Sequence, residues 1–245
     1  MKTRANLNLT LGFMIASSIF GSLVILLMVV YPPMTMQDNF WRKPFVGSIF
    51  FLICAGGSLV AVSPRKCSVA HETQMVKSLM DSDVKTDFLV SSEGHHPDCG
   101  RFSAHTIRFK GNSYCAACTG LLMGGVVAMI VTALYFFFGL NAGSVSFTAV
   151  LVGQLGLASG LTQFKFRSWT RSAANLLFVL GSSFMLIGVD QLVGSVFVDI
   201  YVSGLIVLWI LTRVMISQSD HRRICLSCGF SCGTERKISV LASAT

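Results

Sequence analysis

The chain carries little charge. Only 12% of its 245 residues are Asp, Glu, Lys or Arg, whereas about a quarter is usual in a soluble domain. Hydrophobic residues make up 53%. This composition excludes an ordinary water-soluble domain and indicates that lipid surrounds much of the protein. The net charge of +8 does not indicate nucleic-acid binding, because the basic residues lie at the ends of apolar runs, where topology signals are found.

The sequence also lacks the short motifs of several common enzyme classes. It contains no phosphate-binding loop, no arrangement typical of a nucleophile triad and no His-Glu-x-x-His zinc-protease motif. No reaction can therefore be assigned from a standard motif.

Six apolar runs are each long enough to cross a bilayer, which takes about 20 residues. They lie near 9–31, 44–63, 119–140, 144–164, 172–192 and 196–216. The first follows Met1-Lys2-Thr3-Arg4, as in a signal peptide, but exceeds the apolar core of about 7–15 residues that such peptides have. We interpret it as a retained span and predict an all-α polytopic membrane protein with about six transmembrane helices.

The distribution of Lys and Arg predicts the orientation. With both termini in the cytoplasm, only Arg42 and Lys43 fall outside, and the loops with most basic residues face inward, as the positive-inside rule requires. We therefore predict a multi-pass protein of the cell membrane with N-in/C-in topology. Four parts follow: two spans in 1–63, a cytoplasmic insert in 64–118, four spans in 119–216 and a cytoplasmic tail in 217–245.

The insert contains a candidate zinc site. His96 and Cys99 form one x2-spaced pair, and Cys115 and Cys118 form another after fifteen intervening residues. Between them, 105–109 alternates like a strand and 110–112 is typical of a turn. This order predicts a zinc-ribbon-like insert, because two tight pairs supply the four ligands of a tetrahedral site. His95 and His105 are alternative fourth ligands.

The chemistry of this site depends on the number of ligands. Cytoplasmic thiols stay reduced, so metal binding is favoured over disulfides. Four protein ligands make a closed, structural site, whereas three cysteines alone would leave the open position that catalytic zinc needs. We favour the structural interpretation.

The tail contains a second cysteine cluster, Cys225, Cys228 and Cys232. His221 is the nearest candidate for a fourth ligand, and Cys67 and His71 lie on the same predicted side. Zinc is the expected metal. An iron–sulfur cluster is the alternative, because the spacing resembles part of a ferredoxin motif, and an unligated thiol cluster is a third interpretation.

Small and polar residues in the spans indicate helix packing. Gly120 and Gly124 are four residues apart, as are Gly156 and Gly160, which lets helices approach closely. Three amides, Gln154, Gln163 and Asn175, are expected to form interhelical hydrogen bonds. Asp190 lies near the outer interface and is expected to reach toward water there.

Two motifs follow one another in the chain: Cys115-Ala-Ala-Cys118-Thr-Gly, and then Ser159-Gly-Leu-Thr-Gln163 with Arg171-Ser-Ala-Ala-Asn175. They resemble the C-x-R-C-T-G and D-G-x-T-Q…R-x-S-N-N elements of an uncharacterised integral-membrane family, domain of unknown function 2085. The resemblance covers roughly 95–195. Ser159 replaces an acidic residue of the family pattern, and Ala117 replaces an Arg. The resemblance implies architecture rather than activity, because the biochemical role of the family is not established.

Three functions are compatible with these features. The leading hypothesis is a membrane scaffold, assembly factor or docking module that binds other membrane or cytoplasmic proteins. The alternative is a membrane metalloenzyme or oxidoreductase that uses the cysteine clusters. A transporter with a path along the amides and Asp190 is less favoured, because no span has a charge at mid-depth and no inverted repeat is evident.

Overall fold

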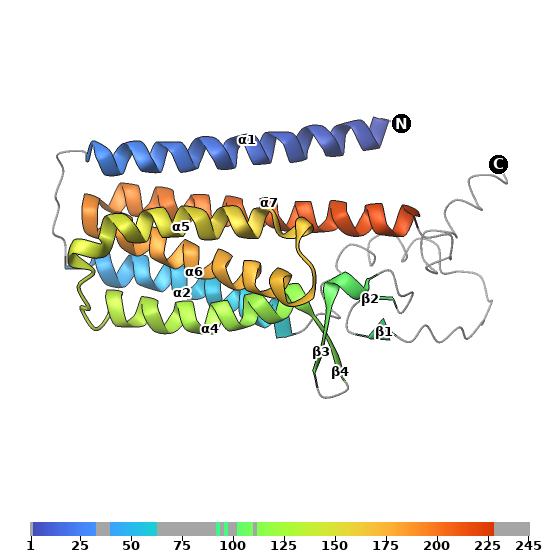
Figure 1. Ribbon diagram of the computed structural model, residues 1–245. Coiled ribbons are helices and arrows are strands. Elements are labelled where there is room, and N and C mark those ends of the chain that lie inside the picture. The colour runs from blue at the N-terminus through green and yellow to red at the C-terminus, as the bar shows by residue number, and fades with distance from the viewer. Residues whose placement is uncertain are drawn as a thin grey trace, which may run out of the picture.

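The computed structural model describes residues 2–32, 40–62, 92–93, 96–97, 102–109 and 112–227. Within them, six helices are long and apolar enough to cross a membrane, which confirms the predicted number of such helices and is compatible with a multi-pass membrane protein. The long helices are α1 (Lys2–Val30), α2 (Arg42–Val62), α4 (Ala116–Phe136), α5 (Ser146–Leu161), α6 (Ser168–Val193) and α7 (Val196–Ser227). They form one elongated bundle, shown in Figure 1.

Helix α6 is the centre of this bundle. It packs against α4, α5 and α7, while α2 packs against α4 and α7, and α1 contacts mainly α7 at the periphery (Figure 1). Met185, Leu186 and Val189 of α6 are fully buried, and Trp209 of α7 is almost so. Many apolar side chains of the other helices instead face outward, as expected where lipid is the solvent.

Glycines allow the central helices to approach closely. A Cβ atom on Gly120 would overlap the carbonyl oxygen of Ser172, and one on Gly156 would lie 2.5 Å from the carbonyl oxygen of Leu177. A Cβ atom on Gly160 would overlap the side chain of Phe178 in α6, and one on Gly124 would lie 3.0 Å from the carbonyl oxygen of Leu176. The predicted role of these two glycine pairs in helix packing is thus confirmed.

A tight turn joins α6 to α7. Gly194 ends α6 with φ of 64°, a left-handed conformation that favours glycine, and its N–H donates to the carbonyl oxygen of Asp190. Helix α7 begins two residues later. Asp190 and Asp199 are therefore brought to the same end of the bundle by one short turn.

The described part of the insert contains two small antiparallel pairs of strands. Strands β1 (Ser92–Glu93) and β2 (His96–Pro97) pair with each other. Strands β3 (Thr106–Phe109) and β4 (Asn112–Cys115) form an antiparallel hairpin, which confirms the strand predicted in 105–109 except at its first residue. Most of the turn predicted in 110–112 lies outside the described residues. The 3-10 helix η1 (Ser103–His105) precedes β3, and two further 3-10 helices, η2 (Gly143–Val145) and η3 (Gln163–Lys165), flank α5.

The hairpin lies at the end of the bundle where α1 begins and α7 ends (Figure 1). We call this the hairpin end and the opposite end the far end. Helix α7 continues to Ser227, well beyond the apolar run that was predicted to end at 216. The predicted tail thus begins as a continuation of the last membrane helix.

Candidate functional site

Two of the predicted zinc ligands lie at the junction between hairpin and membrane helix. Cys115 is the last residue of β4 and the N-cap of α4, and Cys118 is in the first turn of the same helix. Residues three apart on a helix share a face, and the positive end of the helix dipole favours anionic groups such as thiolates. Both cysteines are half-buried, and the Thr119 hydroxyl donates to the Cys115 carbonyl at 2.9 Å.

The remaining predicted ligands are only partly placed. His96 lies in β2, opposite Glu93, and Cys225 lies in the last turns of α7. Their side chains, and Cys99, Cys228 and Cys232 altogether, are outside the described residues. Among the side chains that are described, no group of three His, Cys, Asp or Glu could hold a metal ion. Both metal sites therefore stay predictions.

The alternative ligand His105 has a different environment from the one predicted. Its side chain is buried, and its Nε2 atom lies 3.3 Å from Nη1 of Arg171 and 3.7 Å from Oδ2 of Asp220. A metal ion on this nitrogen would lie against the arginine cation. The contacts therefore favour His105 as a packing residue rather than a zinc ligand.

Arg171 connects the insert to two membrane helices. Besides facing His105, it donates from Nη1 and Nη2 to the same oxygen of Asp220, each at 3.2 Å. The His221 ring lies beside that of His105, with centroids 5.1 Å apart, and Phe102 contacts both rings at their edges. We call His105, Arg171, Asp220 and His221 the hairpin-end cluster.

A second contact holds β3 against the start of α6. Ser168 has φ of 44°, a conformation uncommon outside glycine, and its hydroxyl donates to the Thr106 carbonyl at 2.7 Å. Ile107 and Phe102, on either side of this contact, are almost fully buried. The hairpin is thus fixed to the bundle by both polar and apolar contacts.

Polar residues from three helical segments meet next to the hairpin-end cluster. Arg213 of α7 donates from Nε to Oδ1 of Asn175 at 2.7 Å and lies 3.5 Å from Oε1 of Gln163. Asn175 in turn donates to the Arg171 carbonyl at 2.7 Å. The two amides were expected to join helices, and they do so through Arg213. Gln154 likewise donates to the carbonyl of Ser22 in α1, at 3.2 Å.

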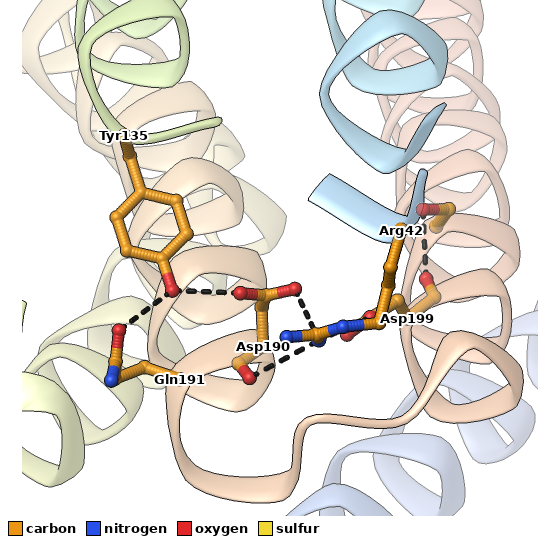
Figure 2. Close-up of polar contacts among 6 residues, drawn as sticks. Arg42, Tyr135, Asp190, Gln191 and Asp199 are labelled. Atoms are coloured by element: carbon orange, nitrogen blue, oxygen red, sulfur yellow. Dashed lines mark hydrogen bonds and ion pairs between the residues drawn. The ribbon is translucent and has the colours of Figure 1, made fainter. Parts of the chain in front are cut away.

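A separate polar group lies at the far end of the bundle. Arg42 of α2 donates from Nη1 to Oδ1 of Asp190 at 2.6 Å and to Oδ2 of Asp199 at 3.1 Å. The Tyr135 hydroxyl from α4 is 2.7 Å from Oδ2 of Asp190 and 2.9 Å from Oε1 of Gln191. These five residues come from α2, α4, α6 and α7, and Figure 2 shows their side chains converging. We call them the far-end cluster.

The far-end cluster corrects the expectation for Asp190. This carboxylate was expected to reach outward toward water, but it is fully buried and paired with Arg42. The partner, Arg42, lies 148 residues earlier in the chain, and the Lys and Arg pattern identifies it only as a topology signal. The sequence contains only a weak signal for this cluster, because Arg42, Asp190 and Asp199 each lie at the predicted outer end of a span.

Comparison of the chain with protein-family models, with curated proteins and with solved structures gave no match in any of the three.

Proposed function

We propose that the chain is a cell-membrane protein with both termini in the cytoplasm. We further propose that a zinc ion stabilises its insert, which serves as a platform for docking a protein partner. His96, Cys99, Cys115 and Cys118 would hold the zinc ion. In this proposal the metal is structural, because four protein ligands leave no open position for a substrate. The Lys and Arg distribution supports the orientation.

The observation that carries the proposal is the direct connection between insert and bundle. Strand β4 runs without a break into α4, so that Cys115 and Cys118 belong to the connection itself. A metal held there would fix the first turn of a membrane helix to the preceding chain. A module attached in this way keeps a constant orientation to the membrane, which is what a docking platform needs.

Apolar burial adds to this attachment. Phe102 and Ile107 are 5% and 3% exposed, and burying a side chain of this kind stabilises by about 1.5–3 kcal/mol. Arg171 and Ser168 add the polar contacts from α6. A segment that only linked two spans would not need an interface of this kind.

The tail cysteines fit the same proposal. Helix α7 brings Cys225 to the hairpin end, one turn beyond His221. A second zinc site formed by Cys225, Cys228 and Cys232, with His221 as a candidate ligand, would extend the platform. His221 also packs against His105 and Phe102, so a metal there would be coupled to the position of the hairpin.

The docking function is tested by site-specific photo-crosslinking in cells. A photoreactive amino acid replaces Tyr114, which is 48% exposed on the hairpin, and Phe197, which is 82% exposed at the far end, serves as the matched control. We expect a discrete protein crosslink from position 114 that is lost when Cys118→Ser is added, and no such product from position 197. Equal products from both positions, or none from 114 while zinc is bound, would contradict the docking function.

A further inference from the structure

The charges of the far-end cluster do not balance. It contains two carboxyl groups, Asp190 and Asp199, and both are fully buried. The cation in contact with them is the guanidinium group of Arg42, which is 6% exposed and uses the same nitrogen, Nη1, for both. If both carboxyl groups were ionised, the cluster would hold one uncompensated negative charge away from water, which is strongly unfavourable.

The two carboxyl groups differ in their partners. Asp190 has a partner on each oxygen, the guanidinium group at 2.6 Å on Oδ1 and the Tyr135 hydroxyl at 2.7 Å on Oδ2. Asp199 has only the longer Arg42 contact, at 3.1 Å on Oδ2. Its buried Oδ1 atom has no hydrogen-bond partner among the described residues. Asp190 is thus the better-stabilised anion, and the excess charge falls on Asp199.

Among the residues that the structure describes, the neighbouring groups do not remove this imbalance. Helix α2 contributes Arg42 and Lys43, α4 contributes Tyr135, and α6 contributes Asp190. The Lys43 ammonium lies 4.8 Å from the centre of the Tyr135 ring, so it faces the ring rather than either carboxyl group. On α7 itself, the Ser203 hydroxyl donates to the backbone carbonyl of Asp199, so this hydrogen bond does not stabilise the carboxyl group of the side chain.

We propose that Asp199 is a binding site for one exchangeable proton, held on Oδ1. Protonation converts the carboxylate to a neutral carboxylic acid, and the proton comes from water and returns to water without any redox change. The remaining charges, Arg42 and Asp190, then form a neutral pair. The proton completes the contact of α2 with α6 and α7, because it removes the repulsion between the two aspartates.

This site makes the stability of the bundle depend on pH. In the unfolded chain an aspartate has released its proton at neutral pH, because its usual pKa is about 3.9. In the proposed site the folded chain still holds that proton. Stability falls with rising pH wherever the folded state binds more protons than the unfolded state. The contribution of Asp199 is therefore present in acid and lost as the pH rises and the proton leaves.

Infrared spectroscopy of the full purified chain in lipid tests the proposal, since a protonated carboxyl group has a C=O stretching band distinct from that of a carboxylate. We expect the carboxylic acid band in the wild type at neutral pH and its loss in Asp199→Asn. The band should grow in Arg42→Gln, because neither carboxyl group then has the Arg42 cation beside it. Asp220→Asn, at the hairpin end, is the matched control and should leave the band unchanged. A wild-type chain without the band at neutral pH would overturn the proposal.

Thermal unfolding across a pH series provides the second measurement. The unfolding midpoint of the wild type should fall as the pH rises. Asp199→Asn should still fold, and its midpoint should not show this decrease, because the amide is neutral at every pH. The series is repeated with sodium replaced by potassium at constant ionic strength. Stabilisation that requires sodium, together with no carboxylic acid band, would show that a metal cation rather than a proton neutralises the cluster.

Discussion

Arg171 places two guanidinium nitrogens, Nη1 and Nη2, each 3.2 Å from one oxygen of Asp220. The pair joins the first turn of α6 to the part of α7 that extends beyond the predicted span. The same guanidinium group faces His105, so one side chain holds the insert and two helices together.

Replacing Arg171 should therefore loosen the insert. In Arg171→Ala, Asp220 loses the cation it is paired with, and His105 loses the guanidinium group beside it. Leaving a partly buried partner unsatisfied lowers the free energy of unfolding by about 1–3 kcal/mol. We expect faster protease cleavage within 102–115 and a lower unfolding temperature. Arg167→Ala is the control, because its side chain is exposed on the same segment. Equal effects of the two substitutions would contradict the role of Arg171.

The glycine contacts predict that two glycine-to-alanine substitutions differ strongly in their effect on stability. In Gly120→Ala the new methyl group meets the backbone of Ser172, which cannot move without shifting α6. Overpacking of this kind costs about 1–3 kcal/mol or more. Gly204→Ala in α7 has open space around the new atom and should be neutral or slightly stabilising. Denaturant unfolding of both variants in the same detergent measures the difference, and similar midpoints would refute the packing.

The proposed orientation can be tested by chemical labelling. Asn141 is exposed in the loop between α4 and α5 at the far end, and Arg108 is exposed on the hairpin. Each is replaced by cysteine, and intact cells are treated with a membrane-impermeant thiol reagent. We expect labelling above that of the parent chain at 141, and at 108 only after permeabilisation. The reverse pattern would place the insert outside the cell.

The tail cluster distinguishes a scaffold from a redox enzyme. A zinc site formed with Cys225, Cys228 and Cys232 is colourless and inert to reduction, whereas an iron–sulfur cluster absorbs visible light and bleaches when reduced. We expect no visible band after anaerobic purification. A reducible band that disappears in Cys228→Ser would favour the oxidoreductase.

The membrane helices and the hairpin could be predicted because their signals are local. Apolar runs of sufficient length indicate the spans, and the alternation in 105–109 indicates β3. The extension of α7 gave no such signal, since residues such as Asp220 and His221 are polar. They contact Arg171 of α6 and His105 of the insert instead of lipid. Hydropathy does not detect a helix that leaves the membrane.

The polar clusters were harder to predict because they depend on distant pairings. Gln163 and Asn175 were placed near each other by the span assignments, but Arg213, which links them, lies 38 residues beyond Asn175. Arg42 and Asp190 are separated by 148 residues, and a single sequence does not show that α2 packs beside the turn between α6 and α7. Only the packing of the helices reveals that one arginine lies between two aspartates.

The central claim is that zinc fixes the insert to the membrane helix through Cys115 and Cys118, and metal analysis of the purified chain tests it most directly. We expect bound zinc in the wild type and one ion fewer per chain in Cys118→Ser, with faster proteolysis of 64–118, because metal binding and folding of such modules are coupled. A chain purified without metal, or a Cys118→Ser variant with unchanged metal content and unchanged proteolysis, would contradict the claim.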